Sequence, residues 1–203
     1  MQSFGGSVIS FLAILNPFAL CLYLEGVVDE LHPRQFVRVL VLASVMSFAA
    51  FVVFALAGEP LLVNLLSVRT ESLRIFSGVI FFVVGYKYAT KGFHATELLR
   101  GTLDELPSAI ALPFMIGAGT ITQSILIGKH HSGGISILII ATVMAVSFTV
   151  VITFNAVRAR VRTRNQPVFD RYVNILSRLN GLLIGAISSQ MIVSGIRDLW
   201  TVK

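Results

Sequence analysis

A proline interrupts the first long apolar segment of this chain. In the stretch AILNPFALCLY (residues 13–23), Asn16 precedes Pro17. Proline has no N–H, and its ring clashes with the carbonyl four residues earlier, here that of Ala13. A carbonyl left unpaired in lipid costs several kcal/mol unless another group satisfies it. The Asn16 amide is a candidate for that role, so we expect the helix to be interrupted here.

A second apolar segment repeats the pattern about a hundred residues later. In AIALPFMIGAGTITQS (residues 109–124), Pro113 is followed by Gly117 and Gly119, and then by Thr120 and Thr122. Glycine lets a backbone leave helical geometry and approach a ligand closely. The sequence therefore predicts two interrupted helices, each broken near the middle of a membrane.

Interrupted helices create a site suited to a zwitterion. The half-helix that begins at a break presents N–H groups and a partial positive charge, and the half that ends there presents carbonyls. The predicted substrate-binding residues are Asn16, Pro17 and Phe18 on one side, Gly117, Gly119, Thr120 and Thr122 on the other, and Gln190 in the last apolar segment. Two plain alternatives stand beside this: the prolines are structural kinks, and Gln190 only joins helices by a hydrogen bond.

The composition predicts an all-α polytopic membrane protein. Of the 203 residues, 55% are hydrophobic and only 13% charged, whereas soluble domains carry about a quarter charged residues. Apolar runs near the required 20 residues favour a helical bundle over a barrel, whose strands would alternate. Six transmembrane helices are predicted, at 4–24, 37–57, 73–89, 109–127, 135–154 and 179–199. The longest polar stretch lies between the last two, where we expect a loop in which the segment VFDRYVNIL forms a short interfacial helix.

The chain further divides into two similar halves. When Pro17 is aligned with Pro113, at an offset of 96, Phe18 meets Phe114. We expect one transmembrane domain, 1–203, made of repeats at approximately 1–100 and 101–203. Three helices in each half require the halves to enter the membrane from opposite sides, which is the inverted-repeat architecture of secondary transporters.

The distribution of basic residues predicts the orientation. Eleven of the 16 Lys and Arg residues fall in the loops after the first, third and fifth helices. By the positive-inside rule these loops are cytoplasmic, so both termini lie outside a prokaryotic plasma (inner) membrane. The net charge of +6 is explained by this bias and by anionic lipid, and nucleic acid is not expected as a partner.

Several functional classes are excluded by missing residue types. No Ser-His-Asp set, phosphate loop or cluster of metal ligands appears, so we expect neither an enzyme nor a cofactor or metal. The single cysteine, Cys21, excludes an internal disulfide and is read as a buried apolar side chain. His130 and His131 are read as solvated loop residues. No acidic or basic side chain falls near the centre of a helix, which favours a neutral or zwitterionic solute.

The segments FLAILNPFAL, ALPFMIGAGTIT and RLNGLLIGAISSQMIVSGI resemble the MarC family along nearly the whole chain. That family includes the SnatA small neutral amino acid transporters. The chain keeps the family's Asn16, Pro17, Gly117, Gly119 and Thr122. It departs from the family pattern at three positions, Ala19, Leu22 and Ala118, where Gly, Pro and Pro are usual.

The resemblance implies a secondary transporter of glycine or alanine-like amino acids that works by alternating access. Its partners would be a small neutral amino acid and membrane lipid, with a proton or sodium ion as the open choices of coupling ion, and a homo-oligomer is compatible with it. A passive small-solute channel and a non-transporting membrane scaffold fit the same residues, and transport assays discriminate between the three.

Overall fold

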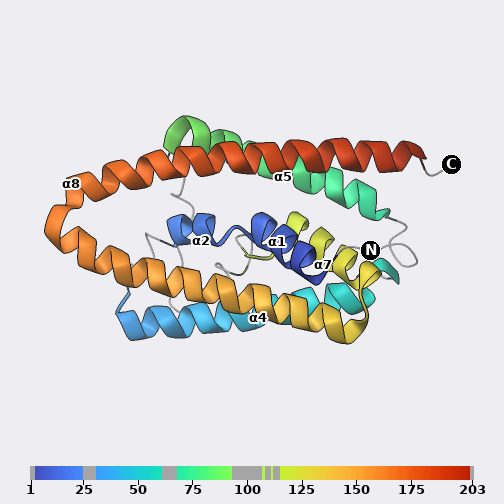
Figure 1. Ribbon diagram of the computed structural model, residues 1–203, viewed down its shortest axis with the longest axis horizontal. Helices are drawn as coiled ribbons and strands as arrows, with labels where there is room; N and C mark the ends of the chain where they lie inside the picture. The colour runs from blue at the N-terminus through green and yellow to red at the C-terminus, as the bar shows by residue number, and fades with distance from the viewer. Residues whose placement is uncertain are drawn as a thin grey trace.

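The computed structural model describes residues 3–24, 31–60, 68–92, 107, 111 and 115–201. Its long elements are all helices (Figure 1). They are α1 (Phe4–Leu15), α2 (Pro17–Tyr23), α4 (Pro33–Pro60), α5 (Thr70–Lys91), α7 (Ala118–His130) and α8 (Gly133–Thr201). The predicted break of the first helix is present, because α1 ends at Leu15 and α2 begins at Pro17.

Five helical segments are long and apolar enough to cross a membrane. They are Phe4–Cys21, Pro33–Gly58, Thr70–Lys91, Gly133–Arg160 and Arg171–Trp200. The expectation of an all-α, multi-helix membrane protein is thus confirmed for the described residues. The predicted helix at 109–127 corresponds there to α7, which has 13 residues and begins only at Ala118. Pro113 and Phe114 lie outside the described residues.

The prediction of a loop between the last two membrane helices was wrong. Residues 133–201 form one helix, α8, and Figure 1 shows it reversing direction between its two apolar halves. The linking residues 161–170 contain no glycine, and their arginines are good helix formers. A proline at position 167 lies within this linking segment, and proline is one common cause of sharp helix kinks. The high density of charged residues in this segment therefore does not indicate a loop.

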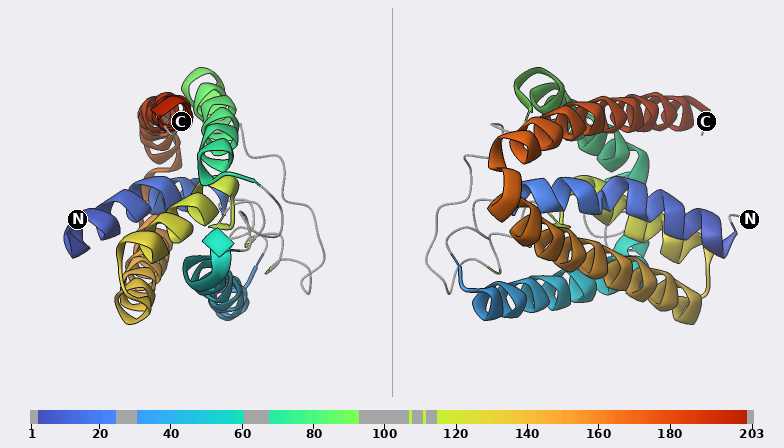
Figure 2. Two further views of the ribbon diagram at one scale, coloured as in Figure 1. Left: turned by 90° about the vertical axis from the view of Figure 1, so that its right-hand side faces the viewer. Right: turned by 60° about the vertical axis from the view of Figure 1, so that its left-hand side comes forward.

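The helices form three layers. α5 and the second half of α8 make one layer, α4 and the first half of α8 make another, and α1, α2 and α7 lie between them (Figures 1 and 2). The first residues of α1 and the last residues of α8 lie at the same end of the molecule (Figure 1). The middle layer therefore holds both segments for which interruptions were predicted.

Two glycine-rich helices form the outer layer made by α5 and the second half of α8. A Cβ atom on Gly85 would lie 2.7 Å from the Gly185 nitrogen, and one on Gly181 would lie 2.4 Å from the Ala89 nitrogen. Such small residues let helix backbones approach closely in membranes. Near the far end of the pair, an Arg74 guanidinium nitrogen lies 2.8 Å from a carboxylate oxygen of Asp198. These contacts set the two helices antiparallel.

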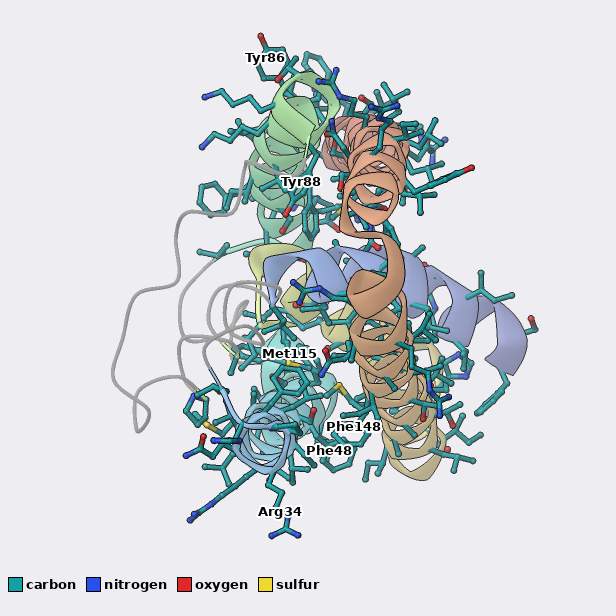
Figure 3. The ribbon with its side chains drawn as sticks, turned by 90° about the vertical axis from the view of Figure 1, so that its left-hand side faces the viewer. Arg34, Phe48, Tyr86, Tyr88, Met115 and Phe148 are labelled. Carbon is teal, nitrogen blue, oxygen red and sulfur yellow. The ribbon has the colours of Figure 1, made fainter. Side chains whose placement is uncertain are left out.

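The second outer layer joins the middle layer through an apolar core. Phe11 of α1 packs edge-on against Phe51 of α4, with ring centroids 5.2 Å apart. Figure 3 shows Phe48 and Phe148 in the space between α4 and the first half of α8, with Met115 above them toward the middle layer. On the outside, Tyr86 of α5 is exposed, while Tyr88 is buried toward α8 (Figure 3).

Candidate functional site

Asn16 forms the break between α1 and α2. Its backbone is left-handed, with φ 47° and ψ 74°, a conformation that asparagine tolerates better than most residues. The Asn16 N–H donates to the Leu12 carbonyl at 2.8 Å and closes α1. Its carbonyl accepts from the Leu20 N–H at 3.1 Å, and its side-chain Oδ1 accepts from the Ala19 N–H at 3.1 Å. One residue therefore ends one helix and caps the next.

The side chain of Asn16 also reaches the last apolar segment. Its Nδ2 donates to Oδ1 of Asn180 in α8 at 2.9 Å. Asn180 is only 6% exposed. Among the described residues, the Asn180 Nδ2 has no hydrogen-bond partner. An amide pair with one unused donor thus lies at the break, contributed by segments 164 residues apart.

Asn180 was missed as a candidate from the sequence. It lies next to Gly181, inside the second half of α8, whereas the predicted candidate, Gln190, falls nearer the middle of the predicted helix. A usable signal existed: an asparagine in an apolar helix is costly unless its amide finds a partner. The partner itself could not be identified from spacing.

The start of α7 is the second polar element of the site. Gly117 is extended, and its N–H donates to Thr120 Oγ1 at 2.9 Å. The Thr120 hydroxyl donates in turn to the Met115 carbonyl at 2.8 Å. Before this turn, the Ile116 N–H bonds to the Ala111 carbonyl at 2.7 Å, one residue further back than in an α-helix. The predicted change of backbone geometry at Gly117 is therefore present.

α7 contacts α5 through two of the predicted residues. Thr122 Oγ1 lies 3.4 Å from Ser77 Oγ, and both residues are 1% exposed. A Cβ atom on Gly119 would lie 2.1 Å from the Phe81 ring. The prediction assigned Gly119 to solute contact, whereas its immediate neighbour in this structure is an aromatic side chain.

The two breaks lie at a similar level in the middle layer. Gln123 Nε2 donates to Ser10 Oγ at 3.1 Å, and Ser7 Oγ lies 2.8 Å from His131 Nε2, so α1 and α7 are antiparallel. From the Ser10–Gln123 contact, six residues along α1 lead to Asn16, and six residues back along α7 lead to residue 117. Each path advances about 9 Å in the same direction. The two polar elements therefore lie at a similar level along the helices.

The remaining predicted residues are divided between the site and the surface. Pro17 and Phe18 are partly buried in the first turn of α2, and the Phe18 ring packs edge-on against Phe154 with centroids 6.0 Å apart. Gln190 is not brought to the break. It is exposed, and its Nε2 donates to Ser194 Oγ at 3.1 Å, one turn further along α8. Of the two adjacent histidines considered above, His130 is exposed and His131 contacts Ser7.

A small cavity lies one to two turns beyond the break along α2. Its volume is about 10 Å³, and it is lined by Cys21, Leu24, Phe36, Val151, Phe154, Asn155 and the buried Arg158. A single water needs roughly this space, and an amino acid needs far more. Entry of a solute at this point therefore requires movement of α2 or of the helices around it.

The chemistry offered by the break is uncharged hydrogen bonding. The amides of Asn16 and Asn180 and the hydroxyls of Thr120, Thr122 and Ser77 carry donors and acceptors but no net charge. Most of these residues are buried. Such a lining suits a small polar solute whose own charges balance.

The outer surfaces identify the class of protein. Large apolar side chains are exposed along the helices that form the outside of the bundle, including Phe76 and Phe82 on α5 and Leu182, Leu183 and Val193 on α8. An exposed apolar surface of this extent indicates a region that contacts membrane lipid or another protein. Together with the five apolar helical segments, it defines a helical membrane protein.

Comparison with known proteins identifies the family. The model of the MarC family of integral membrane proteins matches residues 1–200, and the chain belongs to that family. It is 26% identical to a UPF0056 membrane protein of Aquifex aeolicus, over 98% of this chain and 96% of that one. It is 24% identical to the UPF0056 inner membrane protein YhgN of Escherichia coli, over 97% and 98%.

A third relative comes from an archaeon. The chain is 23% identical to a UPF0056 membrane protein of Pyrococcus horikoshii, over 93% of this chain and 91% of that one. No solved structure matches the chain significantly.

Proposed function

We propose that this MarC-family protein is a secondary transporter of small neutral amino acids, glycine or alanine-like, that works by alternating access. One observation carries the proposal: a helix interrupted at Asn16 presents a buried, uncharged amide pair at the level where α7 begins. Interrupted helices that meet near the middle of a bundle are the usual binding sites of secondary transporters.

The pairing of helices supports two halves related by an inverted repeat. α1 and α7 are antiparallel, and so are α5 and the second half of α8. α4 and the first half of α8 also run in opposite directions, since Gly133 approaches Leu56 while Phe36 and Phe154 line one cavity. Each pair joins one element from residues 1–100 to one from 101–203, as a two-fold axis in the membrane plane requires. Movement of one half against the other then exposes the site to each side in turn.

The uncharged polar side chains at the break, Asn16, Asn180 and Thr120, support selection of a neutral zwitterion. The α1 carbonyls near the break are left without helical donors, in part because Pro17 has no N–H, and they suit an ammonium group. A side chain with a further charge would have to be desolvated without a partner, at a cost of several kcal/mol. Lysine and glutamate should therefore compete poorly with glycine.

Counterflow in proteoliposomes tests the proposal. A transporter accelerates uptake of labelled glycine when unlabelled glycine is trapped inside, because the loaded carrier exchanges in both directions. A channel equilibrates the label without this acceleration, and a scaffold gives the rate of protein-free vesicles. Absence of counterflow for glycine, alanine and serine would overturn the proposal. Imposed proton and sodium gradients identify the coupling ion in the same vesicles.

The proposed orientation places both termini outside the cytoplasmic membrane. The described basic residues Arg34, Arg38, Lys87 and Lys91 lie at the ends of α4 and α5 that face the α8 reversal (Figure 1). This clustering supports a cytoplasmic location for that end of the bundle. A reporter that is active only in the cytoplasm, fused after the last residue, should stay silent, and a strong signal would reverse the orientation.

A further inference from the structure

We propose that Asn180 binds the carboxylate of the solute through its Nδ2, and so determines the preference for a carboxylate-bearing solute. This inference rests on the proposed function and names a residue and a role within it. Asn180 lies on α8, far in sequence from both helix interruptions.

Hydrogen bonding fixes the orientation of both amides at the break. The Ala19 N–H can only donate, so the Asn16 atom that it contacts at 3.1 Å must be Oδ1. The other Asn16 atom is therefore Nδ2, and it donates to Asn180 at 2.9 Å. The Asn180 atom that accepts must then be Oδ1. The atom of the amide pair that is left without a partner among the described residues is therefore Nδ2 of Asn180. The hydrogen bonds themselves determine this assignment of nitrogen and oxygen.

This nitrogen is a buried donor without an acceptor. Asn180 is 6% exposed, and its Nδ2 has no hydrogen-bond partner among the described residues. A buried N–H group without an acceptor destabilises a fold unless a water or another molecule supplies the acceptor. Because Nδ2 and Oδ1 share one carbon, the donor lies beside the Asn16 amide and the interruption of the helix.

Two of the backbone donors in the first turn of α2 are already used. The Ala19 N–H bonds to Asn16 Oδ1, and the Leu20 N–H bonds to the Asn16 carbonyl. Pro17 has no N–H. The first turn of α2 therefore presents fewer free N–H groups than the start of a complete helix would. Asn180 adds a side-chain donor beside them.

The position of Asn180 is held by tight backbone packing. Its neighbour Gly181 approaches α5 so closely that a Cβ there would lie 2.4 Å from the Ala89 nitrogen. The Asn180 donor is therefore positioned by two tightly packed helices, α5 and α8. Asn16, in contrast, lies at the interruption between α1 and α2. A charge-assisted hydrogen bond from such a fixed donor is roughly twice as strong as a neutral one.

The test compares glycine with glycinamide, which lacks the carboxylate. Dissociation constants for both are measured by thermal shift or equilibrium binding on the full-length protein in detergent. The wild-type protein should prefer glycine by at least about tenfold, the factor expected for losing one charge-assisted hydrogen bond. Asn180→Asp keeps the acceptor for Asn16 but replaces the donor by an oxygen that repels a carboxylate. Asn180→Leu removes the donor altogether.

Asn180→Leu should bring the two affinities to within about threefold of each other, because glycine loses its charge-assisted bond and glycinamide loses at most a neutral one. Asn180→Asp should remove the preference for glycine or reverse it, because its oxygen repels the carboxylate but not the amide. Ser188→Ala is the matched control, since Ser188 is an equally buried polar residue on α8 that bonds only to the Gly185 carbonyl. It should keep the wild-type preference.

Three outcomes overturn the inference. An unchanged preference for glycine in Asn180→Asp and Asn180→Leu means that another group binds the carboxylate. An equal loss of affinity for both ligands means that Asn180 only supports Asn16. A wild-type protein that binds glycine without preference over glycinamide removes the need for the donor. A wild-type protein that shows neither binding nor counterflow for any neutral amino acid fails at the proposed function itself, which is a separate result.

Discussion

Two pairs of helical segments in this bundle are held together in different ways. One pair is α5 with the second half of α8, and the other is α1–α2 with α7. α5 and the second half of α8 lie backbone to backbone at Gly85 and Gly181, with no room for a methyl group between them. In the middle layer, the first helix ends at Leu15, the Asn16 amide bonds to Asn180 of α8, and the Thr120 hydroxyl bonds to the Met115 carbonyl before α7. The first pair is held by close backbone packing, whereas the second is joined by hydrogen bonds between polar side chains.

The difference separates the parts that hold the fold from the parts that can change. Close-packed helix pairs have few alternative arrangements, because moving either helix forfeits many small contacts at once. A break bridged by single hydrogen bonds can exchange partners, each worth about 0.5–1.5 kcal/mol net. Substitutions in the two regions should therefore differ in kind as well as in size.

The largest effect is expected from filling the α5–α8 contact. Gly85→Val should lower the free energy of unfolding by about 1–3 kcal/mol or more, because its side chain would meet the Gly185 backbone, which cannot rotate away. The measurement is the melting temperature of the purified protein in detergent. Gly134→Val is the control, since nothing lies within 4 Å of a Cβ there. Equal melting temperatures for the two variants would show that the helix pair is not tightly packed.

The next effect separates the backbone of Asn16 from its amide. Asn16→Gly keeps the left-handed conformation but loses the bonds to Asn180 and Ala19, whereas Asn16→Ala also adds strain of roughly 1–2 kcal/mol. Both should reduce counterflow to near background. Only Asn16→Ala should show the additional loss of stability. Normal transport in Asn16→Gly would mean that the break functions without its amide.

A smaller effect is expected where the middle layer meets α5. Gly119→Ala should destabilise the protein by about 1 kcal/mol, because the new methyl group meets the Phe81 ring. Phe81→Leu in the same chain should restore part of that loss, since the obstacle is a side chain rather than backbone. A double-mutant cycle of melting temperatures measures the coupling. Strictly additive effects would show that Gly119 and Phe81 are not in contact.

The smallest effect is expected from the ion pair at the end of α5 and α8. Arg74→Gln should cost about 0–1 kcal/mol, because both partners are partly solvated and the helices are already held by the glycine contacts. Reversing the pair, with Arg74→Asp and Asp198→Arg together, should recover most of any loss. A loss larger than that of Gly85→Val would invert the ranking of the two contacts.

Much of the fold could be predicted from the sequence because its signals are local. Long apolar runs require membrane-spanning helices, and Pro17 removes a hydrogen bond whatever surrounds it, so the interruption at Asn16 was predictable. The loop expected between the last two helices was wrong for a related reason. The density of charged residues distinguishes membrane-embedded segments from water-exposed ones, but it does not distinguish a loop from a helix. Arginine-rich sequence forms helix readily.

The candidate site was predictable only in part. The changes of backbone geometry at Asn16, Pro17 and Gly117 could be predicted because these residues act on their own backbone, within a few residues in the chain. Gln190 was selected for its depth alone, and depth along a helix does not specify which face points inward. The structure places it on an exposed face, bonded to Ser194.

What the sequence by itself determined about this protein is its class, its apolar helices and the point where the first one breaks, because each follows from bonding and hydration over short distances. Only the tertiary structure decided that Asn180 meets Asn16 across 164 residues, and that the glycines of α8 pack against α5 rather than against another helix. Those choices depend on how whole helices pack, and packing is a property of surfaces that no single stretch of sequence contains.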